Sequence, residues 1–248
     1  MTRNPRLTKT FIGGMLVAAI AGTAYASLAS HALHPAYALT VLALAAATSR
    51  MKIKLPGIDG NMSVNLPFLL MAVVNLSALE AVSIACLSTV VQCWPKSGRK
   101  FRPEQMLFNL SMMAFAASMA NLIWNAGGLG RSAWGGSAWA SEPFMLASAT
   151  AAFFVGQTAP VAGIIKLAEG TAMRRVWLSI IQLSFPYYLL SAGMTSMVNV
   201  VSHHLGWQAA LVVFPVMYGV HLSYRLYFRR AEEAPRTVPL ARAARAGA

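Results

Sequence analysis

Long apolar stretches follow one another along the chain with almost no charged residue inside them, and this pattern restricts it to folds that a lipid bilayer can surround. A helix that crosses a membrane needs about 20 mostly apolar residues, because the hydrocarbon core is about 30 Å thick and each residue adds about 1.5 Å. We predict spans at 11–30, 36–50, 64–77, 79–94, 106–126, 143–165, 176–200 and 207–227. The predicted fold is therefore all-α, a polytopic transmembrane bundle of about eight helices.

The composition agrees with this prediction. Only 11% of the residues are charged and the mean hydropathy is +0.55, whereas an ordinary soluble domain has about 25% charged residues. The net charge of +13 raises the possibility of nucleic-acid binding. Lysine and arginine, however, form short clusters between the apolar stretches, the arrangement of loops that lie against anionic lipid headgroups. We expect the lipid bilayer, and no nucleic acid, as the partner of these charges.

The stretch from Met62 to Trp94 is too long for one ordinary span. Its 33 residues would extend about 50 Å as a single helix. Polar residues in the segment from Asn75 to Glu80 supply hydrogen-bonding atoms for a break, and Pro67 suits the first turn of a helix. We predict a hairpin of two short helices.

The positive charges predict the orientation. On this topology, 19 of the 20 lysines and arginines fall on one side, with Arg131 as the exception. Basic loops stay in the cytoplasm, so both termini are predicted to be cytoplasmic. A single helix over 62–94 would move the later loops to the opposite side and remove this asymmetry.

The predicted domain organisation is simple. Residues 1–228 form a single transmembrane domain, and 229–248 form a basic cytoplasmic tail that we expect to be disordered. The first span has a second interpretation, because a basic start, an apolar core and the segment 24–26 resemble a signal peptide cleaved near residue 26. Its greater apolar length favours a retained helix.

Polar side chains inside the predicted spans are the candidate ligand-binding residues, since an unpaired polar group is costly in lipid. The candidates are Asn121, Asn125, Gln157, Gln182 and His221. The alternative is that they only join helices through hydrogen bonds. Prolines at 160, 186 and 215 predict kinks in the last three spans, which favours a ligand cavity in that half of the chain.

Histidines near the predicted outer face suggest a metal, haem or proton-sensing site. They are His31 and His34 after the first span, and His203 and His204 before the last. The alternative is that these imidazoles only hydrogen-bond water or helix ends among the headgroups. We predict no other cofactor. The sequence has no catalytic motif, and we expect no enzymatic activity.

The segment 52–68, KIKLPGIDGNMSVNLPF, is predicted to be a basic cytoplasmic re-entry loop. Gly57 and Gly60 permit a tight turn, and Ser63 or Asn65 can cap the helix that follows.

This segment, the hairpin after it and PEQMLFNLSMM at 103–113 resemble the multi-helix sensory regions that precede bacterial diguanylate cyclase and HD-type phosphohydrolase domains. The resemblance covers about residues 36–127 and implies a sensor of a small molecule or of the membrane state in a bacterial inner membrane. The sequence lacks a GGDEF or HD output domain, so the resemblance implies action through a partner, such as a signalling protein or an ATPase. Two alternatives stay open: a small transporter or substrate-binding subunit of an uptake system, and an intramembrane metal or haem protein.

Overall fold

The computed structural model describes residues 5–28, 35–54, 61–95, 102–130, 138–205 and 208–233. Within these ranges the side chains are described except at 53–54, 61–62, 126–130, 138–141, 203–205 and 228–233. The helices are α1 (Pro5–Leu28), α2 (Pro35–Ser49), α3 (Leu66–Asn75), α4 (Ala78–Cys93), α5 (Pro103–Gly130), α6 (Ala138–Glu169), α7 (Met173–Leu205) and α8 (Ala209–Glu233). The strands are β1 (Lys52–Lys54) and β2 (Asn61–Ser63).

Five of these helices are long and apolar enough to cross a membrane. The qualifying segments are Pro5–Leu28, Pro103–Asn125, Glu142–Glu169, Met173–Ser202 and Ala209–Tyr227. The helices α2, α3 and α4 are shorter apolar helices. The prediction of a bundle of about eight apolar helices is therefore confirmed within the described part of the chain, and five of them are long enough to cross a membrane.

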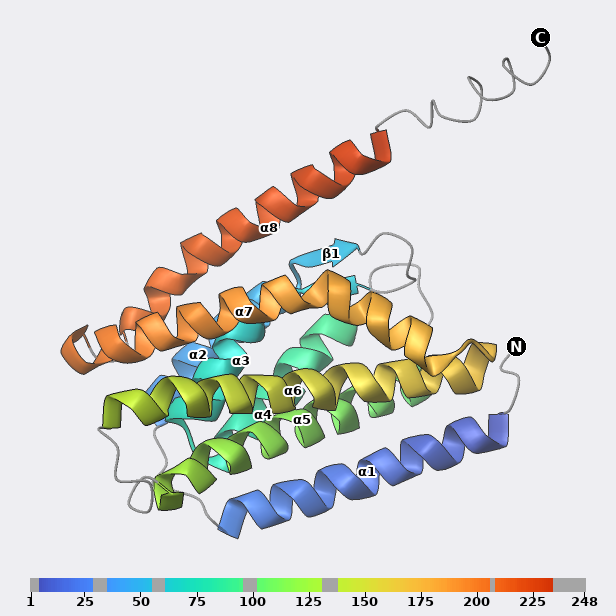
Figure 1. The fold of residues 1–248 in the computed structure, drawn as a ribbon, viewed down its shortest axis with the longest axis horizontal. Helices are drawn as coiled ribbons and strands as arrows, with labels where there is room; N and C mark the ends of the chain where they lie inside the picture. The colour runs from blue at the N-terminus through green and yellow to red at the C-terminus, as the bar shows by residue number, and fades with distance from the viewer. Residues whose placement is uncertain are drawn as a thin grey trace.

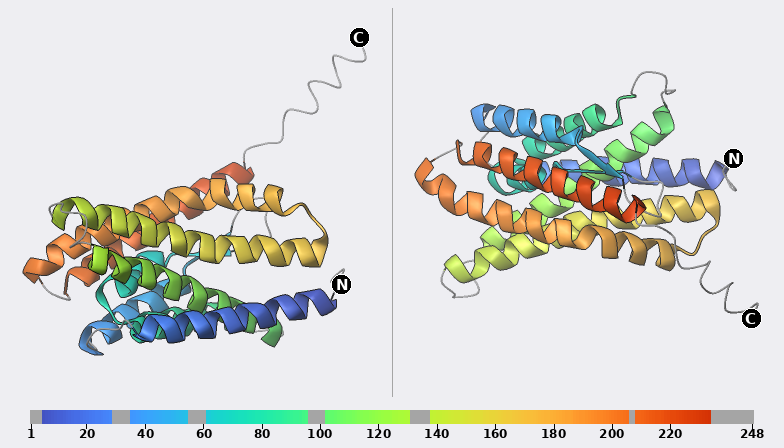
Figure 2. Two further views of the ribbon diagram at one scale, coloured as in Figure 1. Left: turned by 60° about the horizontal axis from the view of Figure 1, so that its bottom comes forward. Right: turned by 90° about the horizontal axis from the view of Figure 1, so that it is seen from above.

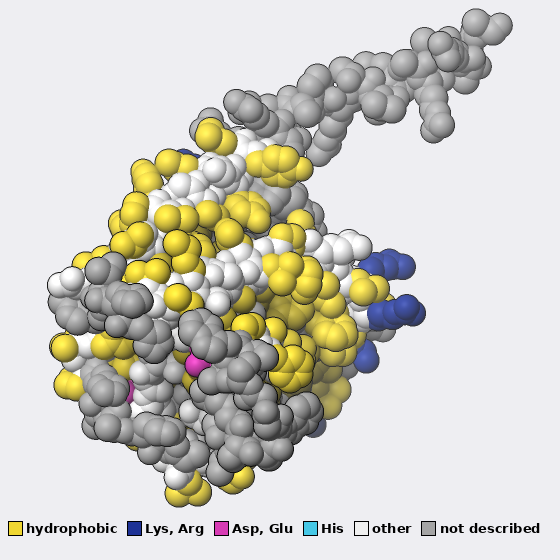
Figure 3. Space-filling model, turned by 60° about the vertical axis from the view of Figure 1, so that its left-hand side comes forward, with side chains coloured by type: hydrophobic (Ala, Val, Ile, Leu, Met, Phe, Trp, Pro, Cys, Tyr) yellow, Lys and Arg dark blue, Asp and Glu magenta, His cyan; other side chains and the backbone are white. Residues whose placement is uncertain are grey.

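The outer surface of the bundle is apolar. Large hydrophobic side chains are widely exposed, among them Val17 (67%), Ile20 (62%), Phe144 (64%), Met197 (68%) and Val212 (60%). Apolar side chains cover much of the face shown in Figure 3. An exposed apolar surface of this extent marks contact with lipid or with another protein, and the lengths of the helices favour lipid.

The long helices α5, α6, α7 and α8 run in alternating directions, and α1 lies along α5 and α6 (Figure 1). The start of α1, the α6–α7 connection and the β hairpin lie at the same end of the bundle (Figure 1). Helix α8 turns back from the end of α7 and lies next to it in the right-hand view of Figure 2, and it also contacts α2 and β1. The β hairpin was not predicted: the sequence indicated a turn here, and the flanking residues pair as antiparallel strands with Lys52 opposite Ser63.

Small residues set the closest helix contacts. A Cβ atom added to Gly156 of α6 would lie 3.0 Å from Cα of Ala116 in α5, so only glycine allows this approach. By contrast, a Cβ atom at Gly219 of α8 would meet nothing within 4 Å. The pair α5–α6 is thus packed backbone to backbone, as small residues permit in membrane helices.

Helix α8 also departs from the predicted domain boundary. It continues to Glu233, five residues beyond the boundary predicted at 228, because Ala231, Glu232 and Glu233 are good helix formers. The rest of the predicted tail, 234–248, lies outside the described residues.

Candidate functional site: the enclosed hairpin

The predicted break between 62 and 94 is present. Helix α3 ends at Asn75 and α4 begins at Ala78, so that only Leu76 and Ser77 join them. Helix α3 packs against α2, α4, α5 and α7, and its residues from Leu66 to Val73 are all buried. A short helix at this depth exposes free backbone groups at both ends, and each of them must find a partner inside the protein.

A single asparagine from α5 serves the carboxyl end of α3. Asn121, which is completely buried, donates from Nδ2 to the carbonyl oxygens of Val73 at 2.9 Å and Leu76 at 3.5 Å. The carbonyl of Val73 has lost its usual helical partner, because the amide of Ser77 donates to Glu80 instead. Asn125, one turn later in α5, donates from Nδ2 to Oδ1 of Asn121 at 2.9 Å and orients it.

The turn itself is a capping box. Oε2 of Glu80 accepts from the amide of Ser77 at 3.0 Å, and the amide of Glu80 donates to Oγ of Ser77 at 3.3 Å. This reciprocal pair satisfies two free donors at the start of α4. Nearby, Asn75 donates from Nδ2 to the carbonyl of Met71 at 3.2 Å and to the hydroxyl of Tyr37 at 3.4 Å. The polar segment recognised in the sequence therefore does cap the break.

The amino end of α3 is held from a different helix, α7. The amide of Leu66 donates to the hydroxyl oxygen of Tyr187 at 3.1 Å. The hydroxyl of Thr195, which donates to the carbonyl of Ser191 at 2.9 Å, lies 3.4 Å from the carbonyl oxygen of Pro67. Ser63 donates to Oδ1 of Asn65 at 2.7 Å. Asn65 is the N-cap residue by position, but its side chain makes no cap hydrogen bond. Its Nδ2 is buried with no hydrogen-bond partner among the described residues.

The carboxyl end of the helical hairpin formed by α3 and α4 is bonded to the β hairpin formed by β1 and β2. Lys52 of β1 donates from Nζ to the carbonyl of Gln92 at 2.6 Å, near the end of α4. A cation at a helix carboxyl end also interacts favourably with the helix dipole. The helical hairpin α3–α4 is thus hydrogen-bonded to β1, α5 and α7.

A second polar network joins α5, α6 and α7. The hydroxyl of Tyr188 donates to Oε1 of Gln157, and Nε2 of Gln157 contacts the sulfur of Met113. The Tyr188 ring packs edge-on against Phe154 with centroids 4.7 Å apart. Gln157 therefore links three helices, which is the helix-joining role that the sequence left open for it.

The five predicted ligand-binding residues do not form one site. Asn121 and Asn125 belong to the hairpin, and Gln157 belongs to the second network. Gln182 is exposed on α7. His221 is half-buried on α8, and its Nδ1 is buried without a hydrogen-bond partner in the described part of the chain.

Sequence reasoning missed Tyr187 and Lys52 as contacts of the hairpin. Tyr187 directly follows Pro186, which had been recognised as a kink, and this was the one signal that could have pointed to it. Nothing in the sequence near Lys52 indicates that its side chain reaches a carbonyl 40 residues later.

The proposed histidine cluster falls outside what is described. His31 and His34 lie in the segment 29–34, and the side chains of His203 and His204 at the end of α7 are likewise outside. Among the described residues, no three His, Cys, Asp or Glu side chains are grouped to hold a metal ion.

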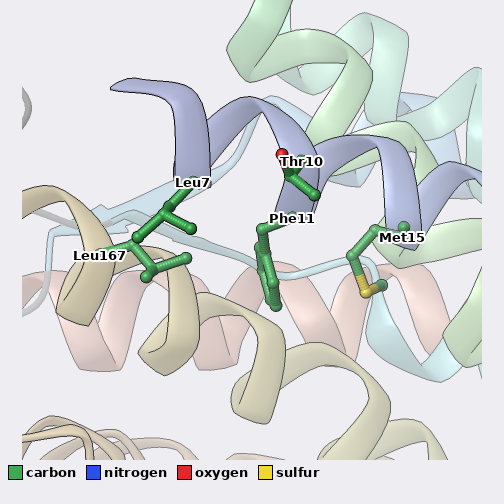
Figure 4. A pocket seen from close by; sticks show the side chains of 6 residues that line it. Leu7, Thr10, Phe11, Met15 and Leu167 are labelled. Atoms are coloured by element: carbon green, nitrogen blue, oxygen red, sulfur yellow. The ribbon is translucent and has the colours of Figure 1, made fainter. Parts of the chain in front are cut away.

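An apolar groove lies apart from these networks, between α1 and the end of α6. Its lining residues are Leu7, Thr10, Phe11, Gly14, Met15 and Leu167, and its volume is about 460 Å³. Leu7 and Leu167 face each other across it, with Phe11 and Met15 following along α1 (Figure 4).

Comparisons with known protein families, with characterised proteins and with solved structures gave no match.

Proposed function

We propose that the chain is a multi-span protein of a bacterial inner membrane that senses a small molecule, or the state of the membrane, and signals through a partner protein. Both termini and the basic ends of the helices face the cytoplasm. Basic residues at the bundle end that holds the β hairpin support this orientation, among them Arg6, Lys166, Arg174 and Arg175.

The observation that carries this proposal is the way α3 is held. Its two ends are capped by side chains from two different long helices, Asn121 of α5 and Tyr187 of α7. A movement of α7 relative to α5 would break one of these caps. Broken helices of this kind recur at binding sites in membrane proteins. A ligand that binds one of two helix arrangements more tightly shifts the protein toward that arrangement.

Helix α7 has the means to make such a movement. Pro186 lies inside it, directly before Tyr187, and removes one backbone hydrogen bond. A bend at this position displaces the hydroxyl that accepts from Leu66. The hairpin is thereby coupled to a helix whose amino end lies at the cytoplasmic surface, where a partner can bind.

The buried side-chain amide of Asn65 indicates the chemistry of the ligand. Asn65 is 2% exposed, and its Nδ2 has no partner in the described part of the chain. An unpaired buried donor costs about 1–3 kcal/mol, so a ligand that supplies an acceptor oxygen there recovers this energy. We therefore propose a small polar molecule with a carbonyl, carboxylate or hydroxyl oxygen, bound where α3 meets α7.

The test is a thermal-shift screen of the purified full-length protein against small carboxylic acids, amides and sugars. We expect at least one compound to stabilise the protein, and Tyr187→Phe and Asn65→Leu to abolish that shift. Gln182→Ala, at an exposed position of the same helix as Tyr187, is the matched control and should keep it. Stabilisation that survives Tyr187→Phe and Asn65→Leu would place the ligand elsewhere and refute this site.

The second candidate function is transport. Prolines inside α6, α7 and α8, at 160, 186 and 215, together with the broken hairpin, are features shared with transporter binding sites. Proteoliposomes distinguish the two functions. Accumulation of a stabilising compound inside sealed vesicles would refute the sensor function and support transport. Binding without accumulation would support the sensor function.

A further inference from the structure

We infer that the groove between α1 and α6 binds one acyl chain of an anionic phospholipid, with the headgroup phosphate held by the basic residues at its mouth. The inference requires that the bundle lies in a bilayer with its basic end at the headgroups. It does not depend on the sensing role.

The lining of the groove suits a hydrocarbon chain. Five of its six residues are apolar or glycine, and the sixth, Thr10, donates its hydroxyl to the carbonyl of Arg6 at 3.1 Å. Thr10 therefore offers mainly its methyl group. From Leu7 to Met15 the groove follows α1 over about 12 Å of membrane depth.

One lining residue of the groove, Phe11, makes close contacts with α5 and α6. Phe11 packs against Gly163 of α6, where an added Cβ would come within 3.2 Å of the ring. The same ring lies 6.2 Å from the ring of Phe108 in α5. Phe11 therefore bridges α1 to α6 beside the groove, and Gly14 adds no side chain to its lining.

Basic residues adjoin the groove lining in the sequence of both α1 and α6. Arg6 and Lys166 are exposed and directly precede the lining residues Leu7 and Leu167. Gly170, with φ of 76°, ends α6 and turns the chain, so that Arg174 and Arg175 follow close after Lys166.

Acidic residues near the groove are fewer than the basic ones. Glu104 pairs with Lys9 at 3.4 Å, and Glu169 lies one turn after Lys166. The excess of cations beside an apolar groove complements a phosphate attached to an acyl chain, and each basic residue near a membrane surface adds to such binding.

Native mass spectrometry of the protein extracted from nanodiscs tests the inference. The discs contain phosphatidylcholine alone or mixed with phosphatidylglycerol. Gly14→Trp places a large side chain on the lining of the groove, and its Cβ atom has room because an added Cβ at Gly14 meets nothing within 4 Å. Gly13→Trp is the matched control, because Gly13 is equally open but does not line the groove.

We expect the wild type and Gly13→Trp to retain phosphatidylglycerol and Gly14→Trp to lose it. The double variant Arg6→Gln, Lys166→Gln should weaken retention about fivefold for each charge removed, with little effect on phosphatidylcholine. Both positions are exposed, so this variant decides the outcome if Gly14→Trp does not fold.

Three results would overturn the inference. Equal retention by Gly14→Trp and Gly13→Trp would show that the lipid binds elsewhere. Equal retention of both lipids, unchanged by the charge variant, would show an unselective lipid layer. A change of oligomeric state in Gly14→Trp with unchanged lipid would show that the groove contacts protein.

Discussion

Replacing Asn121 by alanine should destabilise the protein more than any other single polar substitution in the spans. Asn121 is completely buried, and its amide is the partner of the Val73 carbonyl, whose helical partner, the amide of Ser77, is occupied by Glu80. The substitution leaves that carbonyl unpaired and also weakens the carbonyl bond at Leu76. Asn125 loses the acceptor of its own amide at the same time.

The magnitude follows from the type of bond lost. An interhelical hydrogen bond in a membrane protein contributes about 0.6 kcal/mol on average, because both groups usually find other partners. A buried backbone group left without a partner costs about 1–3 kcal/mol. Since the amide of Ser77, the usual helical partner of the Val73 carbonyl, donates to Glu80, we expect Asn121→Ala to lower the free energy of unfolding by about 2–3 kcal/mol.

The assay is reversible unfolding in mixed micelles of mild detergent and dodecyl sulfate, followed by circular dichroism. Asn125→Ala should cost only about 0.6 kcal/mol, since the amide of Asn125 donates to Asn121 rather than to a backbone carbonyl of α3. When Asn121 is already replaced by alanine, Asn125→Ala should not lower the free energy of unfolding any further. A double-mutant cycle measures this coupling. Gln182→Ala, at an exposed position, is the control for the loss of an amide side chain.

The reasoning fails if Asn121→Ala costs no more than Gln182→Ala. It also fails if the effects of Asn121→Ala and Asn125→Ala simply add, because then the two side chains do not act as one link between α5 and α3.

Three further predictions concern the turn, the helix packing and the orientation. Ser77→Ala should cost about 1 kcal/mol in the same unfolding assay, while Glu80→Gln, which can still complete the capping box, should cost less; equal losses would contradict the box. Gly156→Leu should cost about 1–3 kcal/mol or more through overpacking, while Gly219→Leu, facing open space, should change stability little; the reverse order would contradict the close contact of α5 with α6. Reporter tags placed in the 96–102 loop and at the C-terminus should both indicate the cytoplasm, and opposite compartments would refute the orientation.

Much of the architecture could be predicted because it depends on local properties of the chain. The break at the hairpin followed from the excessive length of 62–94 and from the polar residues between Asn75 and Glu80, and the structure confirms it. The two short strands could not be predicted, because three-residue strands carry too few residues for a pattern and depend on pairing with each other.

The candidate site was only partly accessible from the sequence. Polar residues in apolar spans must find partners, so Asn121 and Gln157 were recognisable as important. Which atoms they bind was not, because the partner of Asn121 lies 48 residues earlier in the chain and that of Leu66 lies 121 residues later.

The sequence by itself determined that the chain forms apolar helices suited to a bilayer, where one of them breaks, and which loops carry the positive charge. These features depend on the length and composition of continuous segments, and on the energy of each segment in lipid or in water. Only the tertiary structure decided that α3 is enclosed, that Asn121 and Tyr187 cap its ends, and that Phe11 lines a groove beside α6. Those contacts join segments distant in the chain, and their geometry depends on how close the helix backbones can approach one another.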